Sequence, residues 1–281
     1  MVGKNSTKKL FSLSGKTAVL TGATGYIGAY FAHALLDSGA RVVLVGKNER
    51  KLKSLAGKLS KRYGDHRVTA ACIDLYDNQA TRIVMEQILR REKKIDILVN
   101  NAFDFSKKTG FNDENGHLVH ATHDQFLASF ESGVYWAVQP TQVFGFAMKK
   151  RGAGSIVNIS TMYAVVAPAQ DLYEGTTVFN PPGYSMAKAG LLQFTKYCAS
   201  FLAPEVRVNA LSPGAIPNTE TITANAIDKG NPVLDRLAKK TPLHRVGHPT
   251  DLLGALVFLA SDASHFMTGQ NIVVDGGLTI I

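Results

Sequence analysis

Short apolar runs alternate with longer amphipathic segments along most of the chain. Seven runs rich in β-branched residues predict strands, at residues 17–21, 42–45, 68–73, 95–100, 155–160, 206–211 and 272–274. Several are apolar at nearly every position, which is typical of strands buried on both faces of a parallel sheet. Segments with apolar residues at helical spacing predict helices, over residues 30–38, 49–63, 79–92, 125–150, 185–202 and 249–260. The alternation predicts an α/β fold, a doubly wound, mostly parallel seven-stranded sheet with helices on both faces.

Three segments interrupt this alternation and predict loops, at residues 103–124, 164–183 and 231–248. In the third, Pro232, Pro242 and Gly247 would interrupt any long helix. A doubly wound sheet binds its ligand beyond the carboxyl ends of its strands. We therefore expect the first two loops to shape a substrate pocket at that edge of the sheet.

Length and composition favour one globular domain over residues 1–281, with a flexible N-terminal extension over residues 1–13. The chain has 281 residues, of which 45% are hydrophobic and 19% charged. No apolar run approaches the roughly 20 residues that span a bilayer, and the basic first residues lack the apolar stretch of a secretory signal. We expect a cytoplasmic protein that does not bind membranes.

The net charge of +9 raises the alternative of a nucleic-acid-binding protein. However, lysine and arginine are spread over most of the length and mixed with acidic residues. This favours a solvated enzyme surface that attracts an anionic dinucleotide and no nucleic acid. Cys72 and Cys198 are far apart and predict buried, unreactive thiols, and the scattered histidines predict no metal site.

A glycine-rich segment, called here the glycine turn, follows the first predicted strand. It reads Thr21-Gly22-Ala23-Thr24-Gly25-Tyr26-Ile27-Gly28. Glycine lets a pyrophosphate approach the backbone, and the helix that begins there stabilises the negative charge. After the second strand, Lys47 stands where an acidic residue would favour NAD, and a basic residue accommodates a 2′-phosphate. NADP is the predicted cofactor, and NAD is the weaker alternative. The alternatives without a function are that the glycine turn is purely structural and that Lys47 is an ordinary exposed lysine.

Tyr184 and Lys188 lie one helical turn apart after the fifth strand, so their side chains share one face of a helix. Hydride transfer to a carbonyl needs a proton donor at the oxygen, and a free tyrosine has a pKa of about 10. We expect the Lys188 ammonium, with the charge of an oxidised nicotinamide, to lower the pKa of Tyr184 toward the working pH. Ser160 and Thr161 are both candidates to hold the substrate oxygen.

Together these motifs resemble the short-chain dehydrogenase/reductase family, in its compact single-domain branch, over residues 16–277. The other matching motifs are Asp74-Leu75, Asn100-Asn101-Ala102, Ser212-Pro213-Gly214 and Val274-Asp275-Gly276-Gly277. The resemblance implies a Rossmann-type fold. It also implies an NADP(H)-dependent oxidoreductase that interconverts a ketone and a secondary alcohol.

The resemblance also implies a role for each matched residue. Tyr184 would be the general acid/base, Thr161 the hydroxyl that holds the substrate, and Lys188 a ligand of the nicotinamide ribose. The residues expected to bind the cofactor, besides Tyr184 and Lys188, are Gly22, Thr24, Gly25 and Ile27 at the pyrophosphate and ribose, Lys47 at the 2′-phosphate, Asp74 and Leu75 at the adenine, Asn101 on the adenosine side and Ile216 at the nicotinamide amide.

Four positions depart from the family pattern. The Gly25-Tyr26 spacing resembles the extended branch, which predicts a changed turn that still binds the cofactor. Phe103 replaces a glycine, and Thr161 replaces a serine. Gly133 stands where an asparagine normally supports a water of the proton relay. The departures motivate an alternative from another class, a cofactor-binding sensor or scaffold with weakened catalysis.

The segment between Met162 and Tyr184 is longer than usual in the family and contains several hydroxyl-binding groups. It resembles family members that act on sugars, polyols or sugar nucleotides, which implies a polar, sugar-like or polyol substrate. The resemblance further implies a homo-oligomer, a dimer or tetramer, that pairs the helices predicted over residues 125–150 and 185–202.

Overall fold

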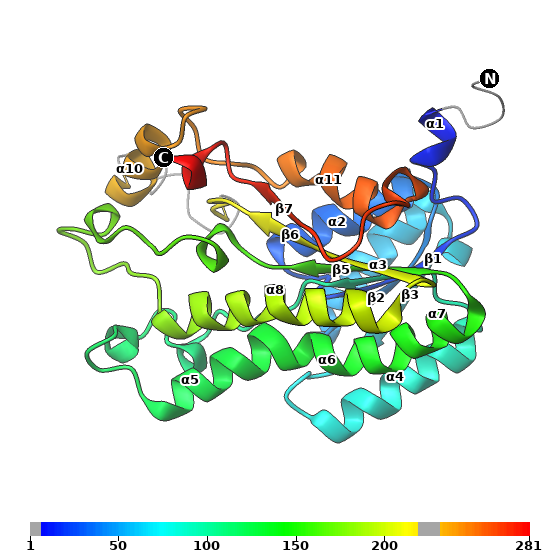
Figure 1. The fold of residues 1–281 in the computed structure, drawn as a ribbon. Helices are drawn as coiled ribbons and strands as arrows, with labels where there is room; N and C mark the ends of the chain where they lie inside the picture. The colour runs from blue at the N-terminus through cyan, green and yellow to red at the C-terminus, as the bar shows by residue number, and fades with distance from the viewer. Residues whose placement is uncertain (1–6, 219–230) are drawn as a thin grey trace.

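The computed structural model describes residues 7–218 and 231–281, and a seven-stranded sheet lies at its centre (Figure 1). The strand order is β3-β2-β1-β4-β5-β6-β7, and every neighbouring pair is parallel. The strands are β1 (Thr17–Thr21), β2 (Arg41–Gly46), β3 (Val68–Cys72), β4 (Ile97–Asn100), β5 (Gly154–Ile159), β6 (Val206–Pro213) and β7 (Asn271–Val274). The predicted fold class and all seven predicted strands are confirmed.

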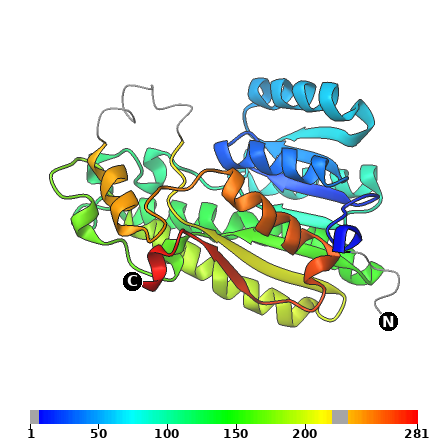
Figure 2. The ribbon, with the colours of Figure 1, turned by 90° about the horizontal axis from the view of Figure 1, so that it is seen from above.

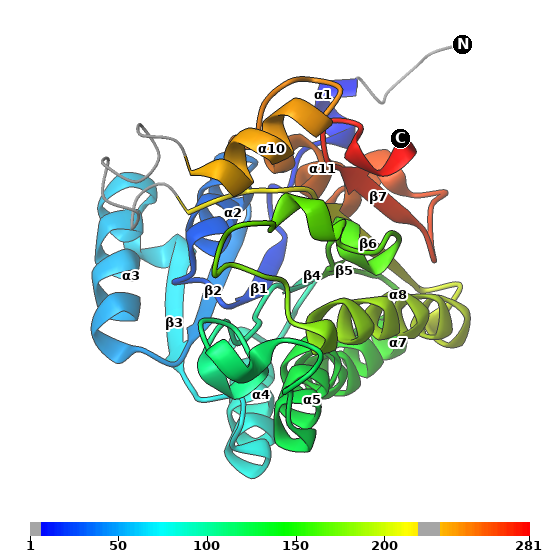
Figure 3. The same cartoon turned by 90° about the vertical axis from the view of Figure 1, so that its left-hand side faces the viewer.

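Helices cover both faces of the sheet (Figures 2 and 3). One face carries α2 (Tyr26–Asp37), α3 (Glu49–Tyr63) and α11 (Thr250–Ala260). The other carries α4 (Asn78–Glu92), α8 (Pro182–Leu202) and a long segmented helix. Each interface has its own apolar core, around Phe31 and Leu256 on the first face and around Met85 and Phe144 on the second.

The segmented helix was predicted as one helix over residues 125–150. It consists of α5 (His123–Phe130), α6 (Trp136–Pro140) and α7 (Phe146–Arg151), joined by π-helical turns at Glu131–Tyr135 and Thr141–Gly145. Pro140 has no N–H to donate, which disturbs the ladder of hydrogen bonds before the second turn. The first turn contains Gly133, and π-helical turns often lie at functional sites.

The prediction of a loop over residues 231–248 was wrong in its first half, where the chain forms α10 (Pro232–Lys240). Pro232 lies at the first turn of this helix, where no N–H is needed and the fixed φ of proline fits. The Asn231 side chain caps the helix by accepting hydrogen bonds from the N–H groups of Val233 and Leu234. Proline therefore starts this helix instead of breaking it.

Two smaller expectations also need correction. The flexible extension expected over residues 1–13 is too long, because Leu13 is fully buried and its N–H donates to the Ser38 carbonyl at 2.7 Å. A short helix, α1 (Thr7–Leu10), precedes it, and residues 1–6 lie outside the described residues. Cys72 was expected to be buried but is exposed, because it ends β3 at the edge of the sheet; Cys198 is buried as expected.

The carboxyl ends of the strands meet at one end of the molecule, which faces the viewer in Figure 3. The strand order reverses between β1 and β4, which is where a doubly wound sheet opens a crevice for a ligand. The predicted loops at residues 103–124 and 164–183 lie at this end and contain only short 3₁₀ turns before the next helix begins. Within the described residues, no helix is both long and apolar enough to cross a bilayer.

Candidate active site

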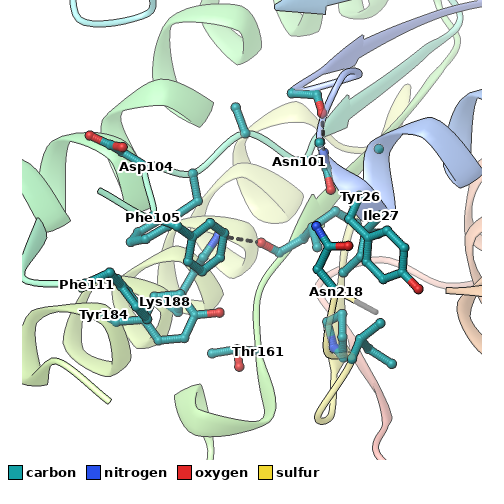
Figure 4. A pocket seen from close by; sticks show the side chains of 18 of the residues that line it. Tyr26, Ile27, Asn101, Asp104, Phe105, Phe111, Thr161, Tyr184, Lys188 and Asn218 are labelled. Atoms are coloured by element: carbon teal, nitrogen blue, oxygen red, sulfur yellow. Dashed lines mark hydrogen bonds between the residues drawn. The ribbon is translucent and has the colours of Figure 1, made fainter. Parts of the chain in front are cut away.

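One pocket of about 920 Å³ opens at the carboxyl end of the sheet. The loops after β1, β2, β4, β5 and β6 and the start of α8 form its walls (Figure 4). The structure brings all twelve predicted site residues into its lining, namely Gly22, Thr24, Gly25, Ile27, Lys47, Asp74, Leu75, Asn101, Thr161, Tyr184, Lys188 and Ile216. They come from seven segments far apart in the sequence, including the loop after β3.

The glycine turn is held against the loop after β4. Gly22 has a φ of 65°, and a Cβ there would lie 2.8 Å from the Cα of Ala102, so only glycine fits. The Asn101 amide donates to the carbonyls of Thr21 at 3.1 Å and Gly22 at 3.2 Å. These two hydrogen bonds from Asn101 stabilise the conformation of the glycine turn. The N-terminus of α2 faces the pocket beside it, which suits a pyrophosphate.

The end of β2 forms the basic end of the pocket. Lys47 is exposed there, and Asn48 and Lys51 line the pocket next to it. The Asn48 side chain accepts a hydrogen bond from the Lys51 N–H at 2.9 Å and so begins α3 at this point. Two lysine side chains at the edge of the pocket fit the negative charge of a 2′-phosphate.

The opposite wall follows β6. The Gly214 N–H donates to the Val274 carbonyl at 2.9 Å, and the Gly247 N–H donates to the Ala215 carbonyl at 2.8 Å. These bonds fix the backbone immediately before Ile216, whose side chain lies against Gly247. The pocket therefore has a backbone-lined wall opposite the glycine turn, and together these residues fit a dinucleotide.

The structure distinguishes the two hydroxyls that end β5. The Ser160 hydroxyl is buried and donates to the Lys188 carbonyl at 3.0 Å, which ties β5 to α8. The Thr161 hydroxyl instead lies beside the Tyr184 phenol in the pocket, where it lowers the pKa of that phenol. Figure 4 shows these two side chains together in the pocket, with Lys188 nearby. Thr161 is the hydroxyl that can act with Tyr184.

The electrostatics of the pair differ from our expectation. Burial raises the pKa of Tyr184 to about 12, the Thr161 hydroxyl opposes that rise, and Tyr163 adds to it. The Lys188 amine donates to the Ile159 carbonyl at 2.8 Å, and burial lowers its pKa to about 7. The protein groups alone do not acidify Tyr184, because burial disfavours the charged form of both side chains. The expected acidification includes the charge of an oxidised nicotinamide and stays a prediction.

Three phenylalanine rings surround the Tyr184 ring. Their centroids lie 4.9 Å (Phe103), 5.9 Å (Phe105) and 5.3 Å (Phe111) from that of Tyr184. We call these four residues the aromatic cluster. The sequence reasoning marked Phe103 as a departure but missed Phe105 and Phe111. The available signal was three phenylalanines within nine residues of an otherwise polar loop, which cannot all remain in water.

The loop at residues 164–183 brings further polar groups to the pocket. The hydroxyls of Tyr163 and Tyr173 lie 3.2 Å apart, and both residues line the pocket, as does Asn180. Burial raises the pKa of both phenols, so they remain neutral hydrogen-bonding groups. In a bonded pair, one phenol donates to the other and the second keeps a free O–H for a ligand. The expectation that this loop shapes the pocket is confirmed.

Comparisons with known proteins find oxidoreductases that match nearly the whole chain. A family model described as enoyl-(acyl carrier protein) reductase matches residues 22–279. A 3-oxoacyl-(acyl-carrier-protein) reductase of Chlamydia pneumoniae is 32% identical over 95% of this chain and 98% of its own. D-threitol dehydrogenase of Mycolicibacterium smegmatis is 32% identical over 96% of this chain and 95% of its own. A crystal structure of a gluconate 5-dehydrogenase from Burkholderia cenocepacia, in complex with NADP and tartrate, is 29% identical, with a TM-score of 0.82 over 98% of this chain and 100% of its own.

Proposed function

The chain belongs to the short-chain dehydrogenase/reductase family, and we propose that it is an NADP(H)-dependent oxidoreductase acting on a ketone or secondary alcohol of sugar-like or polyol type. One observation carries the proposal. The Tyr184 phenol, the Thr161 hydroxyl and the Lys188 amine line the same pocket as the glycine turn. A proton donor and a dinucleotide site therefore share one crevice.

Each of these side chains has a definite task in the proposed reaction. When bound, the nicotinamide dinucleotide supplies or accepts the hydride. Thr161 holds the substrate oxygen by a hydrogen bond, and Tyr184 donates a proton to that oxygen during reduction and removes it during oxidation. Because the protein alone raises the pKa of Tyr184 to about 12, efficient oxidation requires further positive charge near the phenol.

The preference for NADP over NAD rests on the basic end of the pocket. Lys47 and Lys51 line it where the adenosine ribose of a dinucleotide would lie. The Burkholderia gluconate 5-dehydrogenase, which shares the fold over nearly the whole chain, was crystallised with NADP. Both observations support NADP as the cofactor.

The polar substrate class rests on the loop at residues 164–183. Tyr173 and Asn180 place neutral hydrogen-bonding groups in the pocket, and these suit the hydroxyls of a sugar or polyol. Two of the relatives named above carry names of enzymes that act on such compounds, D-threitol and gluconate. The relative that reduces 3-oxoacyl thioesters defines the competing substrate class.

The test follows NADPH absorbance with purified protein and a panel of sugar ketones, simple cyclic ketones and a 3-oxoacyl thioester. We expect oxidation of NADPH with the sugar ketones and at least a tenfold lower kcat/KM with NADH. Tight NADPH binding without turnover across the panel would instead favour the sensor or scaffold. Turnover of the thioester alone would refute the substrate class but not the reaction.

Self-association belongs to the same proposal. Large apolar side chains are exposed on the outer face of α5 to α8, namely Leu127, Phe130, Phe146, Met186, Tyr197 and Phe201. Exposed apolar surface of this kind commonly marks an interface. We propose a homodimer or homotetramer that buries these helices, and light scattering on the purified protein measures its mass. A cytoplasmic location stays a prediction.

A further inference from the structure

Gly133 leaves no room for a larger side chain such as the asparagine that the family resemblance led us to expect there. A Cβ at this position would lie 2.6 Å from the Cβ of Ala187 on α8, and 3.4 Å from an edge carbon of the Phe103 ring. Both neighbours are held in place, Ala187 by its helix and Phe103 by contacts with other rings of the aromatic cluster. The π-helical turn that contains Gly133 is therefore packed directly against Ala187 and the Phe103 ring.

The same ring lies next to the amine of Lys188. The Lys188 Nζ stands over the ring of Phe103, 5.2 Å from its centroid, and donates to the Ile159 carbonyl at 2.8 Å. The Lys188 side chain is buried, with 4% of its surface exposed. A buried ammonium needs electrostatic support, and the negative face of an aromatic ring provides it.

We propose that Phe103 is a positioning residue for Lys188, because its ring fills the space beside Gly133 and holds the Lys188 ammonium by a cation–π contact. The inference rests on the proposed function, since a positioned ammonium matters only if the pocket performs the reaction. Phe103 acts through Lys188.

The sign of the effect follows from which form of lysine the ring favours. The ring stabilises the charged amine and therefore opposes the effect of burial, which lowers the pKa of Lys188 to about 7. Removing the ring lowers that pKa further. Among the pocket-lining residues from Ile159 to Lys188, the other titratable groups are the phenols of Tyr163, Tyr173 and Tyr184, whose pKa values burial raises above the usual 10.

The carboxylate next to Phe103 in the sequence is that of Asp104. It is buried and bound by its neighbours, since it accepts hydrogen bonds from the Tyr76 hydroxyl at 2.8 Å and the Ser106 hydroxyl at 2.9 Å. The Asp104 carboxylate is thus engaged on the side of the loop that faces Tyr76.

The test compares Phe103→Leu with Phe111→Leu. Both substitutions remove a ring that contacts Tyr184, but only Phe103 also carries the lysine contact. The pKa of Lys188 is measured in the free protein from the ¹³Cε resonance of the lysine, assigned by its loss in Lys188→Arg. Phe103→Tyr, which keeps the ring face, tests rescue, and Phe103→Met takes the place of the leucine variant if that variant does not fold.

We expect Phe103→Leu to lower the pKa of Lys188 by about 0.5 to 1 unit, the shift that corresponds to a modest cation–π contact. The pH above which kcat/KM falls should move down by a similar amount, while Phe111→Leu and Phe103→Tyr leave both values near those of the wild type. Equal shifts in the two leucine variants, or no shift in Phe103→Leu, would overturn the inference. An inactive wild type would refute the proposed function, and the resonance measurement, which needs no turnover, would still decide whether the ring supports the amine.

Discussion

The cofactor side and the substrate side of the pocket are lined by different kinds of groups. The cofactor side (Gly22, Gly25, Ile27, Lys47 and Asn101) consists of backbone, small residues and an exposed lysine. The substrate side consists of the aromatic cluster, Thr161 and Lys188, whose polar groups are largely removed from water. On the cofactor side, the positions of backbone groups and of the exposed Lys47 would therefore decide what binds. On the substrate side, burial decides the protonation state of Tyr184 and Lys188.

Because of this difference, we expect the cofactor side to control the affinity for the dinucleotide and the substrate side to control the rate of the reaction. Charge at the basic end is solvated, so each lysine there contributes modestly and salt weakens it. On the substrate side, the proposed chemistry depends on one phenol and one buried amine, so the loss of either group removes a step of the reaction. Substitutions on the two sides should therefore affect different measurements, and their size should fall from the substrate side to the cofactor side.

Tyr184→Phe should have the largest effect. It removes the proposed proton donor but leaves a ring of nearly the same shape inside the aromatic cluster. We expect kcat/KM to fall by roughly 10² to 10⁴-fold, the usual contribution of a general acid, while the dissociation constant of NADPH stays within about threefold. Steady-state kinetics and a fluorescence titration measure the two quantities. Retained turnover would remove Tyr184 from the mechanism.

The same division explains what the sequence could predict. The sheet fixes where each strand ends, so the motifs that follow β1, β2, β4 and β6 reach the pocket independently of loop conformation. Lys47 and Asn101 could therefore be located from their positions in the sequence alone. Phe105 and Phe111 could not, because their places depend on packing against α8 and against each other across a long loop. The effect of burial on the pKa of Tyr184 could not be predicted for a related reason: spacing on a helix reveals proximity but not burial.

Gly133→Ala tests how tightly the substrate side is packed. The new Cβ would lie 2.6 Å from that of Ala187, and because both atoms are attached to helix backbone, one of the two helices must move. We expect a loss of about 1 to 3 kcal/mol in the free energy of unfolding, measured by urea denaturation. Gly57→Ala is the matched control, because a Cβ at Gly57 in α3 meets nothing within 4 Å. It should stabilise the protein by about 0.5 to 1 kcal/mol. If both variants behaved alike, the close contact at Gly133 would carry no strain.

The buried amine should make stability depend on pH. The folded pKa of Lys188, about 7, lies below the unfolded value of 10.5, so between these values the unfolded state binds the additional proton and stability rises with pH. The destabilisation is complete below pH 7 and is relieved as pH increases. Lys188→Met should therefore be more stable than the wild type at pH 6, with a difference that shrinks by about 2 to 3 kcal/mol at pH 9.

The measurement for Lys188→Met is urea denaturation at the two pH values. Tyr184 does not interfere in this window, because its folded pKa of about 12 and its ordinary value of 10 both lie above it. A difference that stayed constant from pH 6 to pH 9 would show that the amine is not desolvated, and the contrast between the two sides of the pocket would then rest on shape alone.

Lys47→Ala should have the smallest effect and should be confined to the cofactor side. Lys47 is exposed, so a bond to a 2′-phosphate would lie at the low end of charge-assisted hydrogen bonds, near 1.5 kcal/mol, which corresponds to about a tenfold weaker NADPH affinity. NADH has no such phosphate, so its affinity should not change. Because the contact is solvated, the effect of Lys47→Ala on NADPH affinity should also diminish at high salt.

Lys61→Ala, which removes an exposed lysine of α3 that does not line the pocket, controls for net charge. Equal losses of affinity for NADPH and NADH would mean that Lys47 shapes the wall of the pocket. Lys51 would then be the candidate that binds the 2′-phosphate.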